Sequence, residues 1–396
     1  MSDEGRTPEA SVKDEKRMPG MSAGESGHTP GISDGKSEQM SVTSGLDPEY
    51  TCKTDILSLT RSELESRMEQ EGQKRFRAGQ IYEWLHVRHV RTFDEMTNLP
   101  KALRCGLDEG YRIMSLEPRQ VLTSRIDGTK KYLFALEDGN VIESVLMRYA
   151  YGLSACISSQ VGCSMGCRFC ASTIGGKIRN LRASEMLLQV TEMSRDAGER
   201  IGHVVIMGSG EPMDNYENLV RFLKIMGDPK GECLSLRDIT VSTCGIVPGI
   251  YRLASEHLPV TLALSLHAPC QEKRERLMPI ARKYPLGEVI DAVRAYFEKT
   301  GRRITFEYSC VEGENTSPDD ARMLADLVSG MNCHINLIPV NPVTERSFRR
   351  PNRAKIEAFR GMLEKRGISV TIRREMGRDI NGACGQLRRS YLSPEE

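Results

Sequence analysis

The segment Val161-Gly-Cys-Ser-Met-Gly-Cys-Arg-Phe-Cys170 is the most informative stretch of this sequence. Its cysteines, Cys163, Cys167 and Cys170, are separated by three and by two residues, and two glycines loosen the loop. Thiolates on such a loop can surround one small metal group, and iron–sulfur clusters are held by cysteine thiolates. A four-iron cluster with three protein ligands keeps one iron open to a small molecule. We therefore expect these cysteines to bind one [4Fe–4S] cluster that has an open coordination position.

Two other interpretations of the three cysteines stay open. A structural zinc ion takes four protein ligands, and no fourth Cys or His follows in the local run. A zinc site would therefore need a distant residue such as His267. The cysteines could also be thiols that bind nothing.

Length and composition indicate an intracellular protein with a large core. A chain of 396 residues is long enough for two domains or for one elaborated barrel. It has no run of eighteen apolar residues and no hydrophobic signal segment at its start, so we expect a soluble, cytoplasmic protein that does not enter a membrane. Twelve cysteines in such a chain favour metal or redox chemistry over a disulfide framework.

The charges are distributed unevenly along the chain. Residues 1–48 contain nine acidic and five basic residues and no apolar period, so we predict a disordered tail there. The rest of the chain is basic, which favours an anionic partner such as nucleic acid. The basic clusters are Lys177/Arg179/Arg182, Arg346/Arg349/Arg350/Arg353, Arg373/Arg374/Arg378 and Arg388/Arg389.

The apolar pattern predicts three structural regions after the tail. Residues 49–110 form a small helical domain, in which Ile81, Trp84 and Leu85 share one helix face. Residues 111–150 form a β-rich connector with a hairpin turn at Asp127-Gly128. Residues 151–392 alternate strand and helix, which predicts the α/β class and a partial (β/α)6 barrel. The strands are expected at residues 154–158, 203–207, 238–242, 260–265, 303–308 and 333–338.

Small polar groups follow most of these strands. Ligands of parallel α/β sheets bind at the carboxyl ends of the strands. The Cys-x₃-Cys-x₂-Cys spacing resembles that of the radical S-adenosylmethionine (SAM) enzymes, so we expect a SAM pocket there. Glu211, in Gly208-Ser-Gly-Glu-Pro212, could receive the SAM ammonium group. The ribose and sulfonium would lie near Ser242, Ser265 and Asn341, and His267 could be structural.

Two further cysteines lie beside this predicted site. Cys156 is on the first barrel strand, and Cys384 is in the glycine-flanked segment Asp379-Ile-Asn-Gly-Ala-Cys-Gly-Gln386. A thiol on a loop of this kind can act as a nucleophile or as a redox partner. Either cysteine could instead be an ordinary small residue.

Residues 54–392 resemble the dual-specificity RNA adenine C2-methyltransferases, which are bacterial radical SAM enzymes. The resemblance implies methylation of adenine 2503 in 23S rRNA and of adenine 37 in certain tRNAs. The matching stretches are Phe76-Arg-Ala-Gly-Gln80, Phe93-Asp-Glu-Met-Thr-Asn-Leu-Pro100, Cys156-Ile-Ser-Ser-Gln-Val-Gly-Cys163, Gly208-Ser-Gly-Glu-Pro212, Ser265-Leu-His-Ala268, Ile335-Asn-Leu-Ile-Pro-Val-Asn341 and Ala383-Cys-Gly-Gln386.

The resemblance also implies a role for each site residue. Cys384 would carry the methyl group, and Cys156 would be its redox partner, forming a transient disulfide with it. Glu143 would be the proton acceptor, although it could be a solvated strand carboxylate. Two SAM molecules would be used in each turnover. The implied SAM contacts are Gly210, Glu211, Ser242, Ser265, Leu266, His267 and Asn341.

The implied partners are 23S rRNA, tRNA and an electron donor such as flavodoxin or ferredoxin, and the chain would be a monomer. One alternative is the sister enzyme that methylates C8 of the same adenine. Another is a non-catalytic iron–sulfur or zinc RNA-binding protein, which would have no need of Cys384.

Overall fold

The computed structural model describes residues 53–341, 347–380 and 386–392. The predicted tail, residues 1–48, and Cys384 lie outside these ranges. Within them, no helix has the length and apolar character needed to cross a membrane. The domain boundaries after residues 48, 110 and 150 stay predictions.

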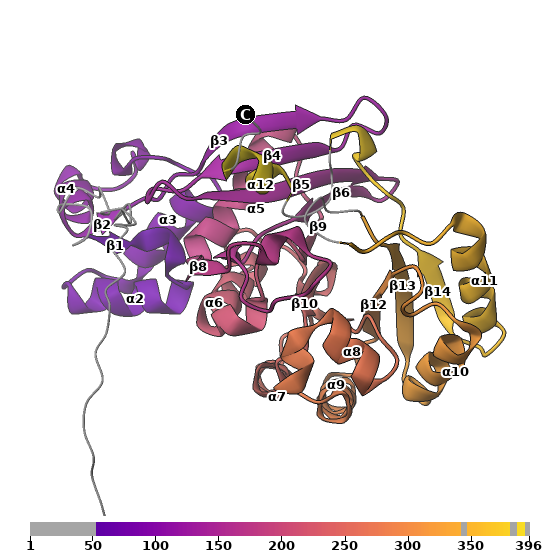
Figure 1. The fold of residues 1–396 in the computed structure, drawn as a ribbon. Coiled ribbons are helices and arrows are strands. Elements are labelled where there is room, and N and C mark those ends of the chain that lie inside the picture. Colours follow the sequence, from indigo (N-terminus) through magenta and orange to yellow (C-terminus); the bar gives the residue numbers. More distant parts are fainter. Residues whose placement is uncertain (1–52, 342–346, 381–385, 393–396) are drawn as a thin grey trace, which may run out of the picture. The chain divides into compact units, whose positions relative to one another are not determined.

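The described part is built on a sheet of ten strands in the order β14-β13-β12-β11-β10-β9-β6-β5-β4-β3 (Figure 1). Seven neighbouring strands are parallel, and their mostly apolar residues suit a sheet that is covered on its faces. These seven are β6 (Gly152–Cys156), β9 (His203–Ile206), β10 (Ile239–Thr243), β11 (Thr261–Ser265), β12 (Ile304–Cys310), β13 (Cys333–Pro339) and β14 (Ser369–Ile372).

Helices alternate with these strands along the chain, as the sequence predicts. They are α5 (Ala183–Ala197), α6 (Tyr216–Gly227), α7 (Val247–Ser255), α8 (Gln271–Leu277), α9 (Leu286–Thr300), α10 (Pro318–Leu327) and α11 (Arg353–Glu364). The α/β class and the partial barrel are therefore confirmed, and β14 adds a strand that the sequence analysis missed. Its four residues alternate in burial, which is too short a pattern to identify a strand.

The β-rich connector continues the barrel sheet instead of standing apart from it. Strands β3 (Glu117–Thr123), β4 (Lys130–Ala135) and β5 (Val141–Tyr149) form an antiparallel meander. Strand β5 then pairs antiparallel with β6, which sets Val145 opposite Cys156. The final helix, α12 (Gln386–Leu392), packs on this meander through Leu387, which contacts Leu133 and Val141.

The N-terminal region is helical, with α2 (Arg61–Gln70), α3 (Arg75–His86) and α4 (Lys101–Gly110). A capping box between Thr60 and Glu63 begins α2. Strands β1 (Thr54–Asp55) and β2 (Tyr111–Arg112) pair and join the two ends of this region. One continuous apolar core includes residues of both this region and the barrel.

Candidate active site

A cavity of about 250 Å³ lies at the carboxyl ends of the parallel strands. The three cysteines of the opening motif line it together with polar residues at or just after the carboxyl ends of several parallel strands. Of the predicted site residues, those in its lining are Cys163, Cys167, Cys170, Gly210, Glu211, Ser242, Ser265, His267 and Asn341. The structure therefore brings together residues that are as much as 178 positions apart in the chain, from Cys163 to Asn341.

The cysteine loop is enclosed by a hairpin of β7 (Gln160–Gly162) and β8 (Lys177–Asn180). Gly162 has a φ of +76°, and a Cβ there would overlap the carbonyl oxygen of Gly176. The backbone N–H of Cys163 donates to that same oxygen at 3.1 Å. Only glycine fits at Gly162, because both the backbone conformation and the close approach exclude a side chain.

The donor set fits an iron–sulfur cluster. Burial raises the pKa of Cys163 to about 12 and that of Cys167 well above its ordinary value, and the neighbouring cysteine charges raise both further. Buried thiolates need a compensating positive charge, which iron supplies. No three His, Cys, Asp or Glu side chains of the described residues converge on a site for one metal ion.

The hydrogen bonding of His267 does not suit a zinc ligand. Its Nδ1 accepts a hydrogen bond from the backbone N–H of Ser309 at 3.0 Å, and its ring meets Phe169 edge-on with the centroids 4.9 Å apart. Burial lowers its pKa to about 3, and the charge of Arg274 lowers it further, so the imidazole is neutral. His267 thus presents the other ring nitrogen as a donor beside the cysteine loop.

A hydrogen bond and a close backbone approach join the loop that carries Glu211 to the segment just before the cysteines. The side-chain oxygen of Gln160, which is fully buried, accepts the backbone N–H of Glu211 at 2.9 Å. Gly208 lies so close to Ile157 that a Cβ would come within 2.6 Å of its carbonyl oxygen. The Glu211 carboxylate accepts the backbone N–H of Cys244 at 2.7 Å, and burial raises its pKa.

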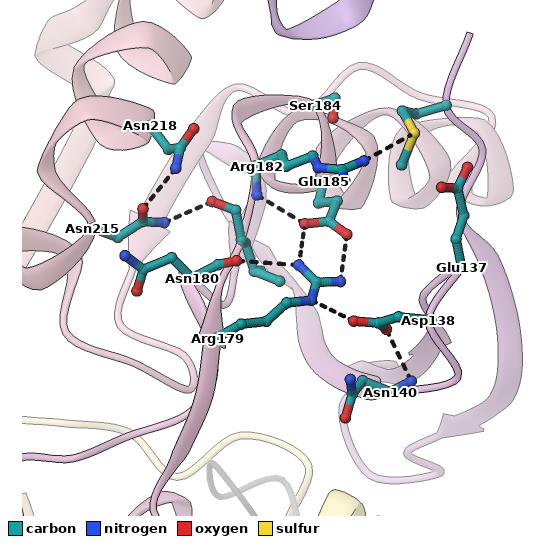
Figure 2. Close-up of polar contacts among 12 residues, drawn as sticks. Glu137, Asp138, Asn140, Arg179, Asn180, Arg182, Ser184, Glu185, Asn215 and Asn218 are labelled. Atoms are coloured by element: carbon teal, nitrogen blue, oxygen red, sulfur yellow. Dashed lines mark hydrogen bonds and ion pairs between the residues drawn. The ribbon is translucent and has the colours of Figure 1, made fainter. Parts of the chain in front are cut away.

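Figure 2 shows a polar network that joins β8 to α5 and to the turn between β4 and β5. Arg179 donates two hydrogen bonds of 2.8 Å to the buried carboxylate of Glu185 and pairs with Asp138. The amide of Asn215 donates to the carbonyl of Leu181 at 2.8 Å. Arg179 was assigned to a cluster for an anionic partner, but internal carboxylates occupy its guanidinium.

Leu266 does not line the cavity. Its side chain is fully buried in the core, and its carbonyl accepts from Nε of Arg274 at 3.2 Å. Arg274 also donates to the carbonyls of Cys244 and Ser265, at 2.6 Å and 3.2 Å. One fully buried guanidinium therefore ties together the chain after two neighbouring strands, β10 and β11.

Cys156 and Glu143 lie on adjacent strands, outside the cavity lining. Cys156 packs in a buried cluster with Met207, which does line the cavity. Glu143 is 3% exposed, so the alternative of a solvated carboxylate is wrong. Its Oε2 lies 3.4 Å from the buried ammonium of Lys131, and Oε1 accepts the backbone N–H of Arg388.

The predicted disulfide involves Cys384, which lies outside the described residues, and no two described cysteines form a disulfide. Gln386, two positions after Cys384, lines the cavity.

The polar cavity residues missed by sequence reasoning include Ser172, Thr173, Cys244, Glu307 and Ser309, and Arg373 is predicted only as part of a basic cluster. Glu307 could have been found, because it is the one acidic residue of β12, in the sequence Ile-Thr-Phe-Glu-Tyr-Ser-Cys. A buried carboxylate in a barrel strand needs a partner or a ligand. The other missed residues have no such pattern around them.

Comparison with known proteins gives a consistent result. Residues 54–113 match the ribosomal RNA large subunit methyltransferase N-terminal domain, and residues 157–327 match the radical SAM superfamily. A Lachnospira eligens protein named probable dual-specificity RNA methyltransferase RlmN is 57% identical over 86% of this chain and 97% of its own length. One of the same name from Alkaliphilus oremlandii is 54% identical, over 86% and 99%. The crystal structure of a radical SAM methyltransferase from Sphaerobacter thermophilus is 44% identical, with a TM-score of 0.79 over 84% of this chain and 98% of that one.

Radical SAM enzymes use a [4Fe–4S] cluster and SAM, and these are the cofactors of this chain. The cavity fits them, since buried thiols and strand-end polar groups line it together. The chain is an RNA methyltransferase, and it belongs to the dual-specificity RNA methyltransferase RlmN family.

Proposed function

We propose that this enzyme methylates C2 of adenine 2503 in 23S rRNA and of adenine 37 in tRNAs, through a methylated Cys384. The supporting observation is that the three cluster cysteines and the strand-end residues Glu211, Ser242, Ser265 and Asn341 line one cavity. Cys156 and Glu143 lie on two adjacent strands next to that cavity. The enzyme would act as a cytoplasmic monomer with flavodoxin or ferredoxin as its electron donor.

A methyl-carrying cysteine is needed because C2 of adenine is an electron-poor carbon and cannot itself attack the methyl sulfonium of SAM. Cys163, Cys167 and Cys170 would hold the cluster, which, when bound, supplies the electron that cleaves SAM to a 5′-deoxyadenosyl radical. The thiolate of Cys384 would first displace the methyl group of another SAM molecule. The 5′-deoxyadenosyl radical would take a hydrogen atom from the methyl group of this thioether, giving 5′-deoxyadenosine, and the resulting carbon radical on Cys384 would add to C2.

The remaining steps would use the strand residues. Glu143, which is fixed by Lys131 and by the backbone of α12, would take the C2 proton. The adduct would also give up one electron, which the cluster would accept. The thiolate of Cys156 would then attack the sulfur of Cys384, so that the disulfide forms and the bond from that sulfur to the former methyl carbon breaks, and the released carbon would take up a proton to become the methyl group of the product. An external thiol would then reduce that disulfide for the next turnover.

Nucleoside mass spectrometry tests this proposal. Unmodified 23S rRNA fragment and tRNA are incubated anaerobically with reconstituted protein, SAM and reductant. We expect 2-methyladenosine with the native chain, none with Cys384→Ala, and a trapped RNA–protein adduct with Cys156→Ala. Cys105→Ala, at an exposed cysteine outside the cavity lining, is the matched control and should leave the product unchanged.

Two results would contradict it. Formation of 8-methyladenosine would assign the chain to the C8 chemistry. Full methylation by the Cys384→Ala variant would show that the reaction does not use a methylated Cys384.

A further inference from the structure

Glu307 is a buried carboxylate in the cavity and does not belong to the predicted SAM contacts. It is 3% exposed, lies on β12 and lines the cavity. Its Oε1 accepts a hydrogen bond from the amide of Asn336 at 2.9 Å. Its Oε2 has no hydrogen-bond partner among the described residues. A buried carboxylate oxygen without a donor is costly, so its presence in a ligand cavity points to a donor on the ligand.

The neighbouring strands hold this carboxylate in a fixed orientation. Ser265, Glu307, Asn336 and Thr371 are register partners on four adjacent strands, β11 to β14. The Thr371 hydroxyl donates to the side-chain oxygen of Asn336 at 2.6 Å. That contact leaves the amide N–H of Asn336 for Oε1 of Glu307, so the oxygen available to a ligand is Oε2.

Burial raises the pKa of Glu307, and the positive charge of Arg373 and the hydrogen bond from Asn336 offset only part of this rise. Arg373 also lines the cavity, as does Ser309, two residues further along β12. Glu307 therefore lies among groups that a polar ligand could contact.

The position of Glu307 in the sheet indicates which part of SAM it meets. Glu211 and the cysteine loop follow β9 and β6, whereas Glu307 lies on β12, three strands beyond β9. If the amino-acid part of SAM is held at the cluster and Glu211, the nucleoside extends toward β11 and β12. Ser242 and Ser265, whose hydroxyls are 3.4 Å apart, lie between these two ends.

We propose that Oε2 of Glu307 accepts a hydrogen bond from a ribose hydroxyl of SAM. Carboxylates serve this purpose in other nucleotide sites, where an acidic residue accepts from a ribose hydroxyl. The inference rests on the proposed SAM contacts at Glu211, Ser242 and Ser265. It adds a residue that distinguishes a ribose from a deoxyribose.

Equilibrium dialysis of SAM with the cluster-loaded full chain under anaerobic conditions tests this inference. The variant is Glu307→Gln, in which a neutral amide replaces the charged acceptor. We expect roughly tenfold weaker SAM binding, the loss typical of a hydrogen bond to a charged group. Asp320→Asn is the matched control, since Asp320 is a fully buried carboxylate outside the cavity lining, and it should leave SAM binding unchanged.

The 2′-deoxy and 3′-deoxy analogues of SAM identify the contact. With the analogue that lacks the bonded hydroxyl, native protein and Glu307→Gln should bind equally well. Equal losses for SAM and for both analogues would overturn the inference, because the substitution would then act on the cavity as a whole. Glu307→Leu is the second variant and should lose at least as much SAM affinity while keeping its iron content.

Ser265→Ala separates this inference from the proposed function. If Ser265→Ala weakens SAM binding and Glu307→Gln does not, the ribose contact is wrong and the SAM pocket stands. Glu307 would then be available to contact the target base instead. If neither variant changes SAM binding, the proposed SAM contacts fail with it.

Discussion

On one side of the cavity a network of hydrogen bonds among the protein's own groups holds the cysteine loop, whereas on the other side one buried carboxylate oxygen is left for a ligand. The first side, the cluster wall, consists of residues 157–180 and 208–215. There the buried amide of Gln160 bonds to Glu211, Asn180 and Asp214, at 2.9, 2.7 and 2.9 Å. The second side, the nucleoside wall, consists of Ser242, Ser265, Glu307, Ser309 and Asn341. There Glu307 keeps one oxygen without a partner among the residues that the structure describes.

The difference follows from what each wall would hold. A cofactor that stays bound needs ligands that are already in position, so a self-satisfied network can surround it. The ribose of SAM, which enters and leaves in every turnover, must replace its hydrogen bonds to water, so the wall that would receive it keeps an acceptor available. Each of the following predictions tests this contrast.

The largest effect is expected on the cluster wall itself. Cys167→Ala should lose the cluster and with it all methylation, because two thiolates cannot hold the four irons. Iron content and the visible absorption of the anaerobically reconstituted protein measure this directly. Ser265→Ala, on the nucleoside wall, should keep full iron content and lose SAM affinity. Loss of iron in both variants would contradict the division into two walls.

A second prediction compares two glycines of the same loop. Gly162→Ala should reduce the unfolding free energy by about 3 kcal/mol or more. The new Cβ would overlap the carbonyl oxygen of Gly176, and the alanine would have to keep a positive φ. Gly175 has a similar φ, +87°, but no atom lies within 4 Å of the position that a Cβ would take there. Gly175→Ala should therefore cost only about 1 kcal/mol, from the backbone conformation alone. Chemical denaturation of both variants measures the difference, and equal costs would show that the hairpin can open.

Arg179 tests how much the polar network contributes. Arg179→Lys should lower the unfolding free energy by about 1–3 kcal/mol, because an ammonium cannot make both bonds to the 3%-exposed side chain of Glu185. The control is Arg322→Lys, whose partner Asp319 lies one turn earlier on the exposed surface of α10, and where the cost should stay below about 0.5 kcal/mol. A cost at Arg179 no larger than that at Arg322 would mean that the network shown in Figure 2 does not stabilise the hairpin.

Features that are local in the chain were easier to predict from the sequence than buried contacts between distant residues. The three cysteines are close in the chain, and the strand β9 was expected within one residue of its observed end at Ile206. Local periodicity and spacing are enough for such features. Arg274 resembles any basic residue of a helix, and its burial depends on carbonyls from two other strands. The burial of Glu143 depends on a contact with Arg388, 245 residues away.

His86 tests whether an unpartnered polar group outside the cavity behaves differently from Glu307. It is 1% exposed at the end of α3, and neither ring nitrogen has a hydrogen-bond partner in the described structure. No ligand of the proposed reaction would reach it, so its unpaired ring nitrogens should only destabilise the folded chain. His86→Phe keeps a ring beside Tyr82 and should raise the unfolding free energy at pH 7 by about 1 kcal/mol.

The pH dependence of the unfolding free energy tests the cost of burying His86. Burial lowers the pKa of His86 from 6.5 to about 3, so between these values the unfolded chain binds the proton that the folded chain excludes. The stability is therefore complete above pH 6.5 and falls as the pH drops toward 3, by about 1.4 kcal/mol per pH unit for this group. His86→Phe should flatten that decline when denaturation midpoints are compared at pH 7 and pH 5. An unchanged slope would mean that His86 takes up a proton in the folded chain as readily as in the unfolded chain, and that its burial does not destabilise the fold.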